Sequence, residues 1–148
     1  MVQFTYRFEK VLTVREQEKK QTEAAYNEAV RSFEKVATKL YELLKKKENL
    51  INYQNERLKM GLTVDEIHHF AKFIDSLEHA IEEVQQKVNQ ARAKMQWYEQ
   101  KLIEKNLEVR KYEKMREKDF SAFQEEQNRI EAQFLDEISS LMYNKRTI

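Results

Sequence analysis

Three side chains in this sequence have a spacing that could hold a metal ion: Asp75, His79 and Glu83 recur at intervals of four residues. Residues four apart share one face of an α-helix, and carboxylates and imidazoles are zinc ligands. Three ligands strung along one straight helix, however, cannot converge on a single tetrahedral ion. We therefore interpret this face as polar and solvated. A zinc-dependent enzyme would require stoichiometric metal in the purified protein.

No other group of residues indicates catalysis or cofactor binding. With one glycine, Gly61, and no cysteine, the chain has no glycine-rich loop for phosphates and no thiolate metal site. A serine or threonine hydroxyl needs a concave, water-excluding pocket to become a nucleophile, and a pair of helices does not form one. The sequence predicts a protein that is not an enzyme and has no cofactor.

The elements that carry these residues are predicted to be two long helices. The chain has no proline and 36% charged residues, so almost nothing ends a helix except Gly61, which tolerates the left-handed conformation after a helix C-terminus. Thr63 can then cap a second helix, with Glu66 completing a capping box. We predict a single all-α domain, a long two-stranded antiparallel coiled-coil hairpin over residues 1–148. Its first helix spans about residues 3–60, its turn about 61–63 and its second helix about 64–143.

The seam between the helices is predicted from apolar residues that alternate steps of three and four, the spacing of a coiled coil. In the second helix the steps are unbroken, at Ile67, Phe70, Ile74, Leu77, Ile81, Val84, Val88, Ala91, Met95, Tyr98 and Leu102. In the first helix they are less regular, at Tyr26, Val30, Phe33, Ala37, Leu40, Leu44, Lys47 and Ile51. Folding the chain at the turn places residue i opposite roughly residue 123 − i.

This register leaves a C-terminal overhang. Phe4 falls opposite about residue 119, so the chain from Phe120 onward projects for about 40 Å if it stays helical. The overhang keeps an apolar stripe, at Phe123, Ile130, Phe134, Ile138 and Leu141. A lone amphipathic helix cannot bury its own face. The stripe therefore either docks on another protein, or packs in a homodimer, or frays.

The register also predicts an apolar patch on one side of the hairpin near the turn. It places Leu50 beside Phe73 and Leu43 beside Ala80, with Tyr53 nearby, where a solvated coiled coil carries charged residues. Such a strip suits a partner protein. The alternative is a widened core, in which these side chains lean over the seam.

Charge and hydropathy limit the partners further. The chain has 27 basic and 26 acidic residues, interleaved along both helices, so it has no field for a phosphate backbone and nucleic acid is not an expected partner. The N-terminus lacks the apolar region of a signal peptide, and no window is apolar enough to span a membrane. These features predict a soluble cytoplasmic protein without direct membrane insertion.

Two stretches resemble the flagellar export protein family FliJ. The first is Phe4–Glu16, FTYRFEKVLTVRE, which resembles the start of many members. The second is the central pair Leu50–Glu56, LINYQNE, and Phe73–Glu82, FIDSLEHAIE. Chain length and the two-helix architecture agree with the family over all 148 residues.

This resemblance implies a non-enzymatic component of the flagellar type III protein export apparatus. Family members resemble the central stalk of rotary ATPases. The resemblance implies a coiled-coil stalk that links the export ATPase hexamer to the cytoplasmic portion of the export gate membrane protein and assists export chaperones. Its expected place is the inner face of the cell membrane at the flagellar base, as a peripheral protein. A monomer is favoured, with a homodimer as the alternative. The competing function is a generic coiled-coil scaffold or a holdase-type chaperone.

The resemblance also implies two sets of binding residues. The set expected to bind the gate protein is Leu50, Tyr53, Phe73, Leu77 and Ala80. Lys46, Arg57 and Val84 depart from the residue types expected there, which alters the predicted footprint. The set expected to sit in the ATPase ring is Phe4, Phe8, Val11, Leu12, Phe123, Ile130, Phe134, Ile138 and Leu141.

Overall fold

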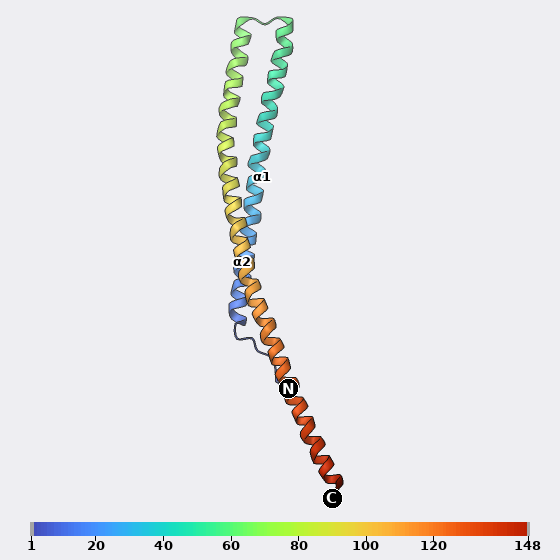
Figure 1. Cartoon of the computed structure of the whole chain (residues 1–148). Coiled ribbons are helices and arrows are strands. Elements are labelled where there is room, and N and C mark those ends of the chain that lie inside the picture. Colours follow the sequence, from blue (N-terminus) through green and yellow to red (C-terminus); the bar gives the residue numbers. More distant parts are fainter. Residues whose placement is uncertain (1, 148) are drawn as a thin grey trace. The chain divides into compact units, whose positions relative to one another are not determined.

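The structure, a computed structural model, describes residues 2–147 and contains two helices, α1 (Glu9–Met60) and α2 (Val64–Thr147). The described residues include no strand. In Figure 1 the two helices lie side by side below the turn that joins them, and they run in opposite directions. The predicted all-α antiparallel hairpin is therefore confirmed.

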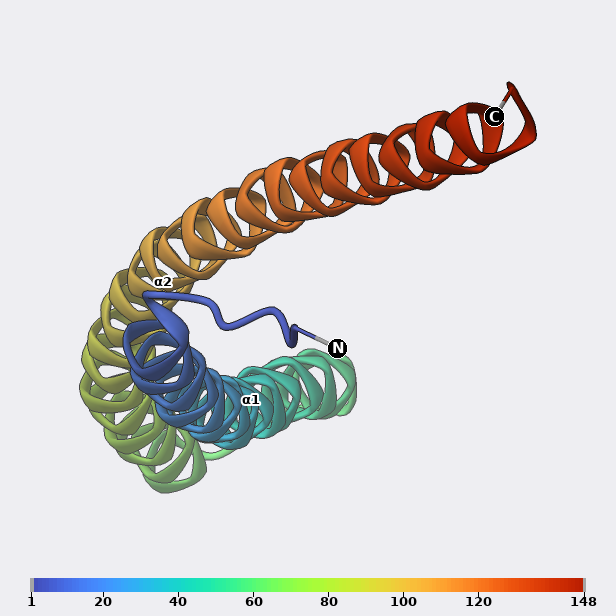
Figure 2. The same cartoon turned by 90° about the horizontal axis from the view of Figure 1, so that it is seen from below.

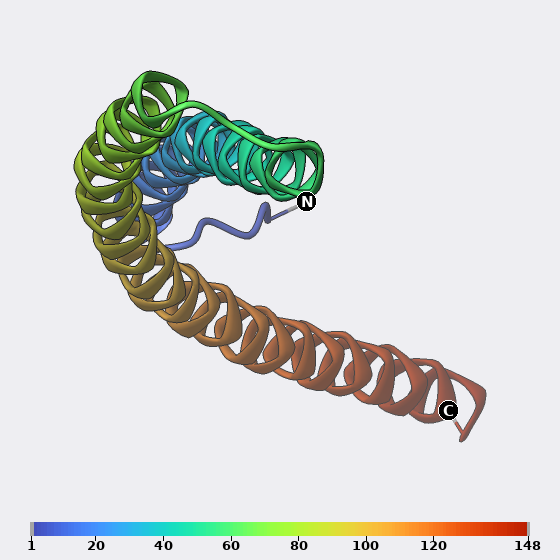
Figure 3. The same ribbon diagram turned by 90° about the horizontal axis from the view of Figure 1, so that it is seen from above.

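The turn forms as the residue types around it predict. Gly61 has φ of 97°, the left-handed conformation that ends α1. The backbone N–H of Glu66 donates a 3.2 Å hydrogen bond to Thr63 Oγ1, which caps α2. The Glu66 carboxylate, however, lies 3.3 Å from Arg57 Nη2, so it joins the two helices across the turn. Figure 3 shows the short non-helical link between the helix ends.

The described residues pack as two compact units, which we treat separately. The turn unit comprises residues 21–103, and the terminal unit comprises residues 2–20 together with residues 104–147. Each unit contains part of both helices. That the two units form one domain remains our prediction.

The predicted seam of the turn unit is buried or half-buried on both helices, except at Leu44 of α1 and at Ile67 of α2, which is 40% exposed. On α2, Leu77, Val84 and Val88 are buried as predicted. On α1, seven of the eight predicted seam residues are half-buried, namely Tyr26, Val30, Phe33, Ala37, Leu40, Lys47 and Ile51. Ala29 is buried, and Val36, Leu43, Leu50 and Gln54 are also half-buried. The predicted seam residue Leu44 is 47% exposed instead. Leu43 is half-buried in its place, and periodicity could not decide between two adjacent leucines.

The terminal unit has a small core in which Leu12 and Val109 come together, as the predicted register implies, but the start of the first helix was predicted incorrectly. The first helix begins at Glu9 rather than near residue 3, and residues 2–6 form neither helix nor strand. This segment folds against α2, where Tyr6, Leu12 and Val109 are at most 5% exposed. The Tyr6 hydroxyl donates a 2.9 Å hydrogen bond to the backbone carbonyl of Tyr112. Loss of contact with water raises the pKa of Tyr6.

An ion-pair cluster lies next to this core in the terminal unit. Glu18 is 3.1 Å from Arg15 and 3.2 Å from Lys105, and Arg15 is also 3.5 Å from Glu108. The hydrogen bonds from Arg15 and then Lys105 lower the pKa of the Glu18 carboxyl. In this part of the hairpin the predicted seam has no apolar residues, and ion pairs join the two helices instead.

Candidate docking surfaces

A shallow groove of about 420 Å³ opens on one side of the turn unit. Its walls are Leu50, Tyr53, Arg57, Glu66, His69, Phe70 and Phe73. The ring of Tyr53 packs 5.9 Å from that of Phe70, measured between centroids, and forms an aromatic floor. The ion pair between Arg57 and Glu66 borders the groove on the side of the turn. We refer to these seven residues as the turn groove.

Large apolar side chains in the turn groove remain accessible. Phe73 is 59% exposed and Tyr53 is 52% exposed, whereas Phe70 is half-buried. Two exposed aromatic rings beside a half-buried one form a concave apolar surface bordered by opposite charges. This composition is typical of a site that takes an apolar side chain from another protein.

The structure brings three of the five predicted gate-binding residues together in this groove, namely Leu50, Tyr53 and Phe73. Leu77 is only 8% exposed and belongs to the seam, where it supports α2 from inside. Ala80 is half-buried, one heptad after Phe73. Of the two readings of the predicted patch, the widened core applies to Leu43 and Leu50, while Tyr53 and Phe73 form an open surface.

A second aromatic cluster lies in the terminal unit, where the N-terminal segment meets α2. The ring of Phe4 lies 5.3 Å from that of Phe120 and 5.4 Å from that of Phe123, between centroids. Phe8 lies 6.2 Å from Tyr112 in the same way. Of the predicted ring-binding residues, Phe4, Phe8, Val11 and Phe123 are therefore half-buried, and Leu12 is 1% exposed. These side chains pack the N-terminal segment against α2, and they do not form an exposed surface.

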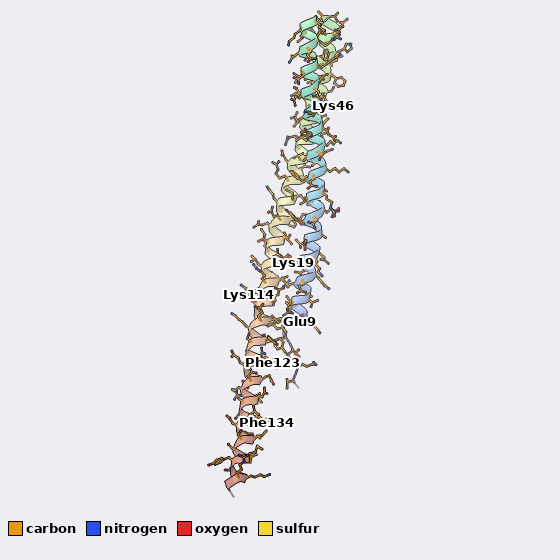
Figure 4. All side chains as sticks on the ribbon, turned by 90° about the vertical axis from the view of Figure 1, so that its right-hand side faces the viewer. Glu9, Lys19, Lys46, Lys114, Phe123 and Phe134 are labelled. Carbon is orange, nitrogen blue, oxygen red and sulfur yellow. The ribbon has the colours of Figure 1, made fainter. Side chains whose placement is uncertain are left out.

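Beyond this cluster α2 continues as a single helix, which we call the tail, residues 128–147. Every side chain from residue 128 to residue 146 is exposed. In Figure 2 the C-terminal end of α2 extends with no other segment beside it. Figure 4 marks Phe134 on this part of the helix and Phe123 nearer to the N-terminal segment. The apolar face of the tail consists of Ile130, Phe134, Leu135, Ile138, Leu141 and Met142, which are 37–67% exposed.

On the polar face that carries Asp75, His79 and Glu83, the histidine bonds to its own helix. His79 Nδ1 lies 2.8 Å from the backbone carbonyl of Asp75, to which it donates a hydrogen bond, and this bond raises the pKa of His79. No group of three acidic or histidine side chains within residues 2–147 could hold a metal ion. Among the same residues, no helix is long and apolar enough to cross a membrane.

Comparison with known proteins covers both surfaces. The family model described as "Flagellar FliJ protein" matches residues 4–147. The chain belongs to the FliJ family. The Flagellar FliJ protein of Bacillus subtilis (strain 168) is 40% identical to it over 136 residues, which is 92% of each chain. No solved structure matches the chain.

Membership of the FliJ family confirms the resemblance drawn from the two sequence stretches, and it supports a role associated with flagellar export. The predicted apolar patch shares Leu50, Tyr53 and Phe73 with the turn groove, whereas Phe70 was predicted only as a seam residue and His69 was not assigned. Both lie within four residues of Phe73, and a helix places such neighbours on adjoining faces. Sequence reasoning also missed the buried Tyr6, although the alternation of Phe4, Tyr6 and Phe8 has the period of an extended chain.

Proposed function

We propose that this FliJ-family chain is a non-enzymatic coiled-coil component of the flagellar type III protein export apparatus. In this proposal the turn groove binds the cytoplasmic portion of the export gate protein, and the tail binds the ring of the export ATPase. The observation that carries the proposal is that a chain with 36% charged residues leaves aromatic and aliphatic side chains exposed at two separate surfaces. Such patches mark interaction sites.

The turn groove supports the first part of the proposal by its geometry. Phe73 is exposed at its edge, and Tyr53 is anchored against Phe70 and therefore loses little side-chain entropy on binding. Aromatic anchors of this kind carry most of the binding energy in protein interfaces. Arg57 and Glu66 can exchange their mutual ion pair for polar contacts with a partner at the rim.

The tail supports the second part by its isolation. From residue 128 to residue 146 it has about five turns of helix, and no turn is covered by another described segment. An amphipathic helix of this kind binds by laying its apolar face into a groove of another protein. The cluster of Phe4, Phe120 and Phe123 holds the base of the tail against the N-terminal segment. We therefore assign ring binding to the tail and a supporting role to Phe4, Phe8, Val11, Leu12 and Phe123.

The remaining elements of the proposal concern assembly. The chain would act as a stalk without chemistry of its own, would assist export chaperones, and would associate peripherally with the inner face of the cell membrane at the flagellar base. A gate-bound protein needs no membrane segment of its own. A generic scaffold or a holdase would use the same apolar surfaces but would bind denatured proteins of unrelated sequence.

The test is a binding assay of the full chain with the purified export ATPase and with the cytoplasmic portion of the gate protein. We expect each to bind the chain, with changes in the turn groove affecting the gate alone and changes in the tail affecting the ATPase alone. Binding to denatured unrelated proteins, with neither of these partners bound, would favour the holdase instead.

A further inference from the structure

Lysines continue the side of the turn unit on which the turn groove lies. Two groove residues, Tyr53 on α1 and Phe73 on α2, each begin a row of residues that recur every seven positions along the helix. Stepping by sevens away from the turn, the rows contain Lys46 and Lys39 on α1, and Ala80, Lys87 and Lys94 on α2. Residues seven apart stay on one side of a coiled coil. We call Lys39, Lys46, Lys87 and Lys94 the lysine strip; Figure 4 marks Lys46 on α1.

The two rows face each other across the hairpin. Nearby contacts fix the register, because Lys47 pairs with Glu78 at 3.3 Å and the guanidinium of Arg92 lies 5.7 Å from the centroid of Phe33. Counting on from these contacts, Lys46 falls opposite about Ala80, and Lys39 falls opposite about Lys87. Positive side chains therefore meet at a position where a hairpin stabilised by its own charges would place opposite signs.

The lysine strip has no counter-ion of its own. In the part of the chain that the structure describes, none of its four ammonium groups makes an ion pair or a hydrogen bond, whereas the adjacent Lys47 does. The carboxylates that border the strip are Glu42 and Glu83. Like charges facing each other weaken the hairpin rather than support it. An anionic partner outside the chain would offset this repulsion.

We infer that the lysine strip and the turn groove form one continuous binding surface for an acidic segment of the gate protein's cytoplasmic portion. An apolar side chain of that segment fills the turn groove, and aspartates or glutamates beside it lie along Lys46, Lys39, Lys87 and Lys94. This inference rests on the proposed function of the turn groove. It adds the chemistry of the partner, which the groove alone does not specify.

The observations favour a protein segment over other anionic partners. An apolar groove of about 420 Å³ adjoins the strip, and a membrane surface or a nucleic acid would leave it unfilled. The chain as a whole has a net charge of only +1, so it lacks the excess of basic residues that nucleic-acid binding needs. A segment with an apolar anchor and acidic neighbours matches both parts of the surface.

The test compares two double variants of the full chain, K39Q/K87Q in the strip and K45Q/K72Q outside it. Lys45 and Lys72 are exposed and do not belong to the two rows. Each variant loses two positive charges, so the two differ only in where the charges are lost. Affinity for the gate protein's cytoplasmic portion is measured at low and at high salt. We expect K39Q/K87Q to weaken binding about 5- to 30-fold at low salt, with a smaller difference at high salt, and K45Q/K72Q to change it less than about twofold.

Three outcomes would overturn the inference alone: equal effects of the two variants, an effect independent of salt, or gate binding that needs Phe73 but not the lysines. Lysine-dependent binding to phosphatidylglycerol vesicles or to duplex DNA, with gate affinity unchanged, would assign the strip to that ligand instead. Failure of the wild-type chain to bind the gate protein would overturn the proposed function as well. Thermal unfolding of K39Q/K87Q serves as the folding control, and it should occur at or above the wild-type temperature because a repulsion is removed.

Discussion

The hydroxyl of Tyr6 donates a hydrogen bond to the backbone carbonyl of Tyr112, more than a hundred residues later in the chain, and this bond holds the N-terminal segment on α2. The same segment carries Phe4 onto Phe120 and Phe123, immediately before the tail begins. The base of the tail is thus fixed by residues 2–8. Substitutions within residues 2–8 should therefore make α2 more mobile beyond Phe120, even though the sequence of α2 is unchanged.

We predict that Leu12→Ala will destabilise the chain by about 2–5 kcal/mol, because the side chain is 1% exposed and a cavity would remain. Tyr6→Phe should destabilise it less, since only the hydroxyl is lost. Urea denaturation followed by circular dichroism measures both. Val2→Ala is the control, because Val2 is 69% exposed in the same segment. Equal stability of Leu12→Ala and wild type would mean that this core does not form in solution.

The ion-pair cluster predicts a loss of stability in acid. The hydrogen bonds from Arg15 and Lys105 lower the pKa of Glu18 from its ordinary 4.5. A carboxyl whose pKa is lower in the folded chain stabilises the fold above its unfolded pKa, and this contribution is lost as the pH falls through the folded value. Wild-type stability should therefore decline below about pH 4.5 more steeply than that of Glu18→Gln. Parallel pH profiles of the two proteins, from denaturation at pH 7 down to pH 3, would contradict the assignment.

The turn allows the cost of backbone conformation to be measured without steric effects. A Cβ built on Gly61 would meet nothing within 4 Å, yet φ is 97°. Gly61→Ala should therefore cost about 1–2 kcal/mol through backbone strain alone.

Thr63→Ala should cost about 1 kcal/mol, because the N–H of Glu66 loses its cap. Thr63→Ser, which keeps the hydroxyl, is the control for this change. Thermal unfolding of all three variants measures these effects.

A sequence pattern predicts structure well when it is compatible with only one local conformation, and poorly when several packings suit it equally. The turn was predictable because Gly61 and Thr63 have residue types with a specific backbone role. The choice between Leu43 and Leu44 on α1 was not, because they are neighbours of the same type, and either choice buries a leucine. The opening segment was also misplaced, since the helical composition of the whole chain outweighed the two-residue alternation that ends at Phe8.

The same distinction applies to the candidate docking surfaces. Tyr53 and Phe73 were identified from their types and spacing, and the structure brings them into one groove. The register also placed Phe4 opposite about residue 119, and its ring contacts Phe120, but the sequence did not show that residues 2–6 are not helical. The opposition of Lys39 and Lys87 needs the register of the two helices to within about two residues, which only the contacts across the seam supply.

The turn groove predicts a selective loss of gate binding. Phe73→Ala should weaken the affinity for the gate protein's cytoplasmic portion about 10- to 30-fold, because an exposed aromatic anchor is removed. Stability should change little, since Phe73 is already 59% exposed. Val64→Ala is a matched control, because Val64 is 70% exposed near the turn but does not line the groove. Isothermal titration calorimetry gives the affinities. An equal loss for both variants would indicate a general effect of the turn rather than a groove.

The tail predicts the complementary result with the export ATPase. Phe134→Ala combined with Leu141→Ala removes two large side chains of its apolar face, with exposed fractions of 59% and 67%. We expect binding to the ATPase ring to fall by about 100-fold or more, because a helix that docks through one face loses two of its anchors.

Gate binding should be unaffected by this double change, and so should the cooperative unfolding of the core around Leu12, since the tail covers no other described segment. The matched control is Gln133→Ala with Ser140→Ala, which alters exposed polar residues of the same tail and keeps the apolar face. Sedimentation velocity of each variant alone separates the alternatives. A wild-type dimer that becomes a monomer in the Phe134→Ala, Leu141→Ala variant, with ATPase binding unchanged, would show that the face pairs two copies of the chain instead of docking in the ring.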